Sequence, residues 1–307
     1  NIVDMIIVGQ FVGPSGLSAV SIGGEFMHFF TFLAVGFAQA GMVVLAQYIG
    51  AGQRQSISLV IGNMFSFILG LSLVVTLISV LFADRFAVLM NTPTESFQEA
   101  VDYCIVCGGG MFFVYGYNIV SHVMRGLGDS KRPLYFVAVS AVMNLILDLI
   151  FVARFRMGAR GAALATVIGQ SFSFLVSMVY LYCQREAFGF DFKLQSYRPD
   201  KKILLTMIKL GIPICLQNTA ISISMMYVTA CINTYGVIYS AVTGVSSKIA
   251  QLCNIVTASL NAAGATMVGQ NFGAGKHDRV QRIFWVTLLI SLLFAELLSV
   301  LLLLFAG

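Results

Sequence analysis

The stretch QYIGAGQ, residues 47–53, returns later in the chain as QNFGAGK, residues 270–276, at an offset of 223. Upstream, the tripeptide SAV at 18–20 recurs at 240–242, at an offset of 222. Two matches in the same order and register indicate an internal duplication. Both copies of the longer motif lie where a long apolar run enters a polar loop. The chain therefore reads as two similar halves in parallel orientation, a plan that recurs among membrane transporters.

The composition is that of an all-α polytopic membrane protein. Of 307 residues, 58% are hydrophobic and 10% are charged, with a mean hydropathy of +0.90, whereas a soluble domain carries about 25% charged residues. Polar and apolar residues do not alternate along the runs, which excludes a transmembrane barrel. A spanning helix needs about 20 apolar residues, and nine segments are predicted: 1–12 (partial), 17–49, 57–83, 100–124, 133–153, 158–183, 203–233, 237–268 and 280–306.

The duplication divides these segments into two bundles. Residues 1–184 form an N-terminal bundle of helices one to six, 185–202 form a cytoplasmic linker, and 203–307 form the C-terminal bundle with helices seven to nine. The chain opens and closes inside apolar runs, so both ends are expected to be truncated. By the repeat, about three more helices follow in the parent protein. The predicted architecture is two pseudo-symmetric six-helix bundles.

The loops predict the orientation in the membrane. Loops after the even-numbered segments hold thirteen Lys and Arg residues when Lys209 just inside segment seven is included, and the opposite loops hold four. Cytoplasmic loops carry the excess of positive charge. The basic loops are therefore expected in the cytoplasm and the chain in the plasma (inner) membrane.

Charged residues inside the apolar runs are candidate functional residues. Each costs about 2.5–3.5 kcal/mol at the centre of a membrane helix and usually faces a polar interior, where it marks an ion or substrate path. Interhelical hydrogen bonds that only hold the bundle together are the structural alternative. The residues are Asp4, Glu25, Asp148, Lys248 and Glu296.

One helix face carries a stripe of side-chain oxygens. Ser140, Asn144 and Asp148 are four residues apart and share a face, and Thr166 with Gln170 begins a similar stripe on the next segment. Oxygen ligands suit a hard cation or a proton. The stripe predicts a cation site.

Other motifs lead to no chemistry. Gly273 to Lys276 resembles the end of a phosphate-binding loop, but Gln270 replaces its first glycine and His277 follows in place of Ser or Thr. No nucleotide, nucleic acid, cofactor or resident metal is expected. If the chain transports a solute, the energy for transport is expected to come from an ion gradient. The six cysteines lie in or beside apolar runs and read as core residues rather than a disulfide framework.

These features together resemble the multidrug and toxic compound extrusion (MATE) family along essentially the whole chain. The ordered set is specific, although no single piece is diagnostic. The motifs are Val3-Asp4 followed by Gly9, VLAQ at 44–47, GAG at 50–52, RGLGD at 125–129, NLILD at 144–148, GARGAALAT at 158–166 and LGIP at 210–213.

The resemblance implies a function and a site. In this family an Asp of helix one, an Asn/Asp pair of helix five and a Thr of helix six couple transport to a cation, which matches Asp4, Asn144, Asp148 and Thr166 here. The expected activity is efflux of organic, often cationic, compounds in exchange for Na⁺ or H⁺ by alternating access. The protein is expected to be no enzyme and to work as a monomer.

One branch of the family carries a coupling Glu in helix seven, and this chain departs from that pattern. Residues 214–221 read ICLQNTAI and offer only Gln217 and Asn218, which remain candidates for the substrate cavity together with Ser140 and Gln170. Coupling through the second half is therefore in doubt, unless helices beyond this chain supply an acid.

Glu25 and Lys248 occupy matching positions of the repeat, within one residue. They form a hypothetical gate across the central cleft, or two independent charges. Two other functions stay open. A lipid-linked oligosaccharide or lipid flippase of a related fold would need a cationic cavity. A membrane protein without transport activity would use its polar stripes only for packing.

Overall fold

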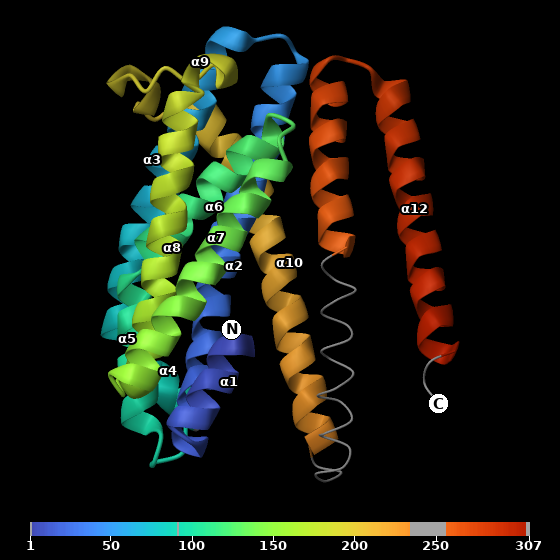
Figure 1. Cartoon of the computed structure of the whole chain (residues 1–307). Coiled ribbons are helices and arrows are strands. Elements are labelled where there is room, and N and C mark those ends of the chain that lie inside the picture. The colour runs from blue at the N-terminus through green and yellow to red at the C-terminus, as the bar shows by residue number, and fades with distance from the viewer. Residues whose placement is uncertain (1, 91, 234–255, 305–307) are drawn as a thin grey trace.

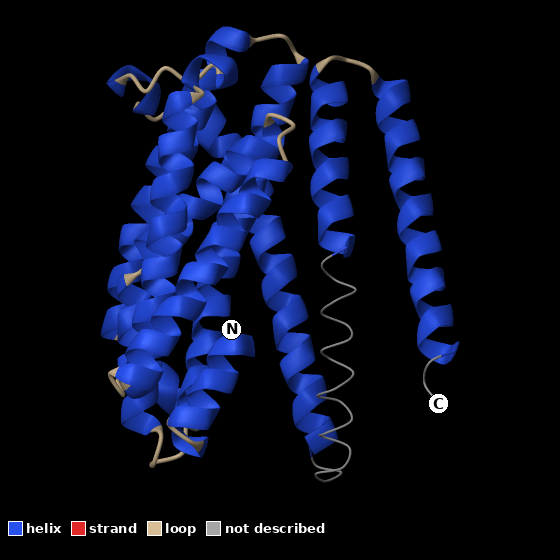
Figure 2. Cartoon of the chain, in the orientation of Figure 1, coloured by secondary structure: helices blue, strands red, loops and turns tan. Residues whose placement is uncertain are grey.

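The computed structural model describes residues 2–90, 92–233 and 256–304, and the described chain is nearly all helix, without a strand (Figures 1 and 2). Six described helices are long and apolar enough to cross a membrane. A seventh span arises if a bent pair counts as one. The all-α membrane architecture predicted from composition is confirmed.

The elements follow the predicted segments closely. The helix α1 has only ten residues in this chain, and the predicted run 237–268 is described from residue 256 onward, where residues 256–273 are helical. In chain order the elements are α1 (Ile2–Phe11), α2 (Pro14–Gly50), α3 (Arg54–Leu81), α4 (Ala83–Leu89), α5 (Phe97–Gly109), α6 (Met111–Gly126), α7 (Lys131–Asp148), the π-helix η1 (Leu149–Arg154), α8 (Gly158–Cys183), α9 (Arg185–Phe188), the 3₁₀ helix η2 (Leu194–Tyr197), α10 (Lys201–Asn233), helix 256–273 and α12 (His277–Leu304).

The segment predicted as one helix over 100–124 is instead a broken span. Its parts α5 and α6 meet at an angle of 48° around Gly110. At Gly110 a Cβ atom would approach Val167 of α8 to 2.5 Å, so a side chain there would push α8 away. The absence of a side chain lets the bent span and α8 pack closely in lipid.

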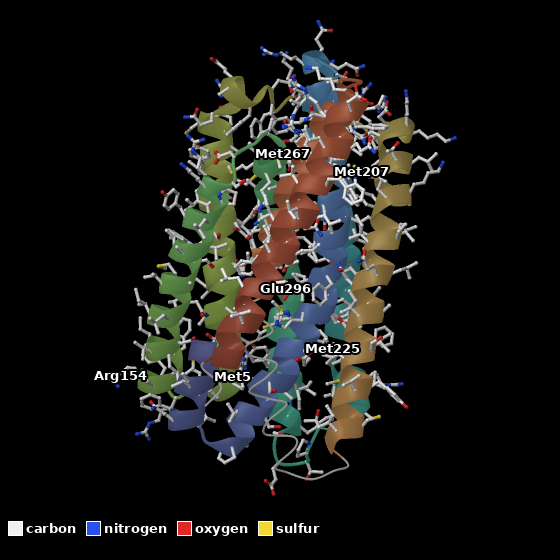
Figure 3. The ribbon with its side chains drawn as sticks, turned by 90° about the vertical axis from the view of Figure 1, so that its right-hand side faces the viewer. Met5, Arg154, Met207, Met225, Met267 and Glu296 are labelled. Atoms are coloured by element: carbon white, nitrogen blue, oxygen red, sulfur yellow. The ribbon has the colours of Figure 1, made fainter. Side chains whose placement is uncertain are left out.

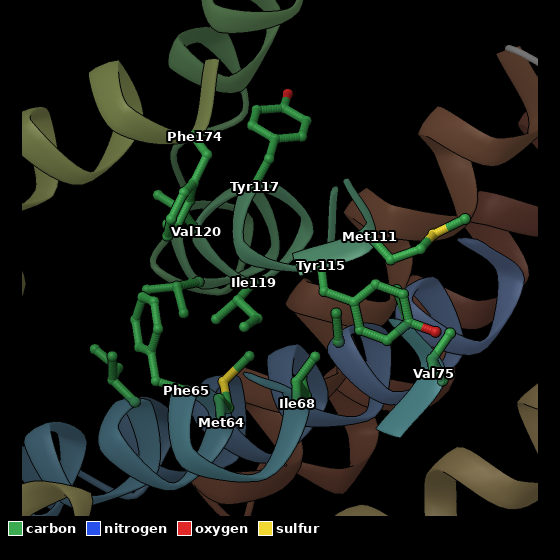
Figure 4. Packing of buried hydrophobic residues seen from close by; sticks show 14 of the residues in the cluster. Met64, Phe65, Ile68, Val75, Met111, Tyr115, Tyr117, Ile119, Val120 and Phe174 are labelled. Atoms are coloured by element: carbon green, nitrogen blue, oxygen red, sulfur yellow. The ribbon is translucent and has the colours of Figure 1, made fainter. Parts of the chain in front are cut away.

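The first bundle has a continuous apolar core in which α3 and α6 face each other. Met64, Phe65 and Ile68 of α3 pack against Tyr115 and Ile119 of α6 (Figure 4), and all five are nearly fully buried. The long helix α2 packs against α3, α5 and α6 and also against α10, so it belongs to both halves.

The repeated motif forms one close contact between the two halves. A Cβ atom on Gly50 would overlap the backbone carbonyl of Gln270, and one on Gly273 would overlap the carbonyl of Gln47. The offset of 223 relates Gly50 to Gly273 and Gln47 to Gln270. Each copy of the motif therefore makes the same contact with the other copy, as expected around a pseudo-two-fold axis. Figure 1 shows helix 256–273 beside the end of α2 from which the chain enters α3. We call this contact the glycine crossing.

The linker is docked on α3 rather than loose. Ser58 Oγ donates to Asp191 Oδ1 at 2.5 Å, Ser66 Oγ donates to the Tyr197 carbonyl at 2.7 Å, and the Asp200 N–H donates to Asn63 Oδ1 at 2.7 Å. Hydrogen bonds from Ser58, and next from Ser196, lower the pKa of Asp191. The linker therefore moves with the first bundle.

Gly50→Ala and Gly273→Ala should each lower the midpoint of thermal unfolding of the full-length protein in detergent. Overpacking against a backbone costs about 1–3 kcal/mol. Gly70→Ala is the control, because a Cβ on this helical glycine meets nothing within 4 Å. Equal midpoints for all three variants would contradict the crossing.

Asp191→Asn should speed trypsin cleavage after Lys193 severalfold, because the amide accepts more weakly from Ser58 and Ser196. Glu186→Gln, at an exposed linker residue, should leave the rate unchanged. Because the folded-state pKa of Asp191 is lowered, docking is strengthened above the ordinary value of about 3.9 and weakens as pH falls through the folded-state value. Equal cleavage rates of both variants would show that the carboxylate does not hold the linker.

Candidate cation site

The site lies where α7 and α8 approach each other most closely. On α8, Gly169 faces α7, and a Cβ there would lie 3.2 Å from the Ser140 carbonyl and 3.3 Å from Asn144 Cβ. One turn further along α8, Ser173 Oγ donates to the Phe136 carbonyl at 3.1 Å. The oxygen stripe predicted on 140–148 therefore faces the stripe that begins at Thr166.

Asn144 links three helices. In the amide orientation that satisfies both of its ends, its nitrogen donates to Asp4 Oδ1 of α1 at 3.0 Å and its oxygen accepts from the Thr166 N–H of α8 at 3.2 Å. Asp4 is 1% exposed and Asp148 is fully buried. The structure thus brings together Asp4, Asn144, Asp148 and Thr166, the four residues predicted as the cation site.

The two carboxyl groups of this cluster lie close enough to interact electrostatically. Asp148 interacts with the Asp4 side chain, and among the described residues neither Asp148 oxygen has a hydrogen-bond donor. Two carboxylates this close within a low-dielectric interior repel each other strongly unless a proton or a cation lies between them. The arrangement is suited to exchanging a proton or a small hard cation.

Tyr103 of α5 is a site residue that the sequence reasoning missed. Its ring fills the space beside Gly23 of α2, and it is 1% exposed. Its hydroxyl interacts with the Thr166 side chain and lies near Asp4. A tyrosine in an apolar run reads as core, and the packing of α5 against α8 is what brings it to the site.

The other candidates lie apart from this cluster or outside the described chain. Gln170 is half-buried one turn beyond Thr166, and Ser140 is buried one turn before Asn144. Glu25 on α2 and Gln217 on α10 are exposed, and Asn218 is half-buried. Lys248 lies outside the described residues, so its pairing with Glu25 stays a prediction.

Comparison with known proteins gives the same family from three directions. The family model MatE matches residues 1–150 and 213–307. The chain is 28% identical to the probable multidrug resistance protein YoeA of Bacillus subtilis (strain 168), covering all of this chain and 67% of the relative. It is 29% identical to the probable multidrug resistance protein YpnP of the same organism, covering 91% of this chain and 62% of the relative.

Solved structures share the fold. A crystal structure of MATE in the bent conformation matches with a TM-score of 0.91 at 23% identity, over 99% of this chain and 68% of that one. An outward-facing conformation of a multidrug resistance MATE family transporter matches with a TM-score of 0.89 at 23% identity, over 100% of this chain and 68% of that one. The chain therefore spans about two thirds of the length of its matches.

Tyr103→Phe should weaken cation binding by the full-length protein about 5- to 10-fold, because the loss of one hydrogen bond costs about 1 kcal/mol. Tyr115→Phe is the matched control, since its hydroxyl donates to the Phe30 carbonyl in the core, away from the site. Equilibrium binding of radioactive Na⁺, or of protons by titration, measures both. Similar affinities for the two variants would remove Tyr103 from the site.

Proposed function

Because the chain belongs to the MatE family, we propose that the full-length protein exports small organic compounds, often cationic, in exchange for Na⁺ or H⁺. Both curated relatives are described as probable multidrug resistance proteins. The observation that carries the exchange is the proximity of two buried carboxyl groups, those of Asp4 and Asp148. It supplies a site for a single positive charge inside the first bundle.

The proposed cation changes the preferred conformation because it neutralises the repulsion between Asp4 and Asp148. With the site empty, repulsion between the two carboxylates favours any conformation that separates or hydrates them. With a cation bound, Asn144 and Thr166 can hold the two acids together across α1, α7 and α8. Since linkage is reciprocal, a substrate that favours the first conformation lowers the affinity for the cation by the same factor.

Alternating access is proposed to arise from movement of the two halves relative to each other. In the proposed cycle, the glycine crossing is formed when the central cavity is closed to the cytoplasm, and it separates when the cavity opens inward. The loops after α2, α6 and helix 256–273 lie at the same end of the molecule as the linker (Figure 1). Their positive charge supports a cytoplasmic position for this end under the positive-inside rule.

The charges of the described interior favour export of cations over a flippase for lipid-linked oligosaccharides. Such a flippase would need buried cations to hold an anionic pyrophosphate. Among the described residues, Asp4 and Asp148 are buried, and no Lys or Arg is. Lys248 lies outside this set.

Cells that express the full-length protein should extrude ethidium, and Asp148→Asn should lower the gradient-dependent rate to less than about one tenth, a barrier increase of at least ~1.4 kcal/mol. The amide cannot hold the negative charge that the cation neutralises. Asp84→Asn, at an exposed acid of α4, controls for expression and charge.

Efflux that collapses when the ion gradient is dissipated, and that is lost only in Asp148→Asn, is the expected result. Unchanged efflux in Asp148→Asn would move coupling away from the acid pair. If neither the wild type nor the Asp84→Asn control extruded the dye, the proposed export function would be wrong for this substrate class.

A further inference from the structure

A cavity with charged walls opens at the end of the first bundle opposite the linker. Its volume is about 610 Å³. Figure 3 shows Arg154 and Met5 toward this end, with Met207 and Met267 toward the other. The charged residues in its wall are Glu99 and Asp102 of α5, Arg156 in the turn before α8, and Arg160 in the first turn of α8. The proposed export function does not assign it a role.

Every element that lines this cavity continues into the cation site. On α5, Glu99 precedes Tyr103 by one helical turn, and in the α7–η1 helix Val152 follows Asp148 by one turn. On α1, Gln10 lines the cavity and lies six residues from Asp4. At 1.5 Å per helical residue, these steps correspond to about 6–9 Å along each helix. The cavity therefore lies one to two helical turns from the acid pair along these helices.

A thin apolar layer separates the cavity from the site. Val152 and Ala159 line the cavity and also pack in one buried cluster with Ile7, Val8 and Tyr103. Several other members of this cluster are alanines, including Ala100, Ala162 and Ala163. This layer, in which many side chains are small, is about one helical turn thick and lies between the cavity and the site.

Glu99 is the free acid of this cavity. Its Oε2 atom is enclosed and has no hydrogen-bond partner among the described residues, whereas Asp102 accepts from Gln98 Nε2 at 3.0 Å. An enclosed carboxylate oxygen without a donor is a ready ligand for a cation that arrives without its full hydration shell. The two arginines of the opposite wall reduce the local attraction for cations.

We propose that this cavity is an outer vestibule through which the coupling cation reaches Asp4 and Asp148, with Glu99 as the carboxylate that captures it. The inference rests on the proposed function and adds a route. The small cation enters the first bundle from its outer end, whereas the organic substrate uses the central cavity between the halves. The two positive charges then need not pass each other.

The test compares Glu99→Gln with Glu95→Gln in the full-length protein reconstituted into liposomes. Glu95 is an exposed acid of the same loop region but does not line the cavity. The readout is the rate of ethidium transport, measured while external Na⁺ is varied at fixed pH. Glu99→Gln should raise the half-saturating Na⁺ concentration about threefold or more without changing the maximal rate. This is the result expected when electrostatic steering of the cation is lost. Glu95→Gln should leave it unchanged.

Two further variants test the route by sign and by shape. Arg160→Gln removes a repelling charge from the vestibule and should lower the half-saturating Na⁺ concentration. Ala153→Phe narrows the cavity without changing its charge and should raise that concentration at low and high salt alike, whereas the Glu99→Gln effect should shrink at high salt. If the wild type runs on protons alone, external proton concentration replaces Na⁺.

Equilibrium binding of radioactive Na⁺ in detergent separates capture from ligation. Unchanged affinity in Glu99→Gln supports a route, and a loss as large as the kinetic shift would make Glu99 a ligand and overturn it. Equal shifts in Glu99→Gln and Glu95→Gln, or none in Glu99→Gln and Ala153→Phe, would also overturn it. Failure of the exchange function itself shows differently, as a wild type without cation dependence.

Discussion

The close approach of two helix backbones at Gly50 and Gly273 is the constraint on which the arrangement of the halves depends. In a bilayer, apolar side chains gain nothing by leaving lipid for one another, so helices associate through close packing and hydrogen bonds. A side chain on either glycine would overlap a carbonyl group of the other helix. Because α2 also packs against α3, α5 and α6, the crossing attaches the second half directly to the interior of the first.

The acid pair and the glycine crossing are separated in space, and the helix α2 connects them. Asp4 lies on α1, which packs against α2, and α2 carries Gly50 at its far end. If the spacing between Asp4 and Asp148 changed, α1 would move relative to α7 and η1, against which it packs. One helix therefore lies between the proposed ion site and the contact that closes the two halves, and α2 is the element both sites can bias.

Much of this architecture follows from simple sequence rules. Hydropathy locates the spans to within a few residues, because a bilayer requires long apolar helices. The repeat places Gly50 and Gly273 in equivalent positions, and the spacing of Asn144 and Asp148 predicts a shared face. Asp4 and Asp148 come together with Asn144 and Thr166 because ionisable side chains inside apolar runs face the polar interior of the bundle rather than lipid.

The features that sequence reasoning missed depend on contacts between segments. The close approach of Val167 on α8 to Gly110 involves two separate segments, and the π-helix after Asp148 has no local sequence signal. Tyr103 becomes a site residue only through its position beside Thr166 and Asp4. The linker 185–202 reads as an ordinary polar loop, yet its carbonyl groups and carboxylates meet polar side chains of α3 that the pattern of apolar runs hides.

The docked linker changes how the connection between the halves should be understood. A free segment of this length would let the second half explore a wide volume, with the effective concentration set by a flexible chain. Here the chain is held against α3 up to Asp200, and α10 begins one residue later. The second half is therefore hinged rather than tethered. The search that brings Gly273 to Gln47 is reduced from diffusion in three dimensions to rotation about a fixed point.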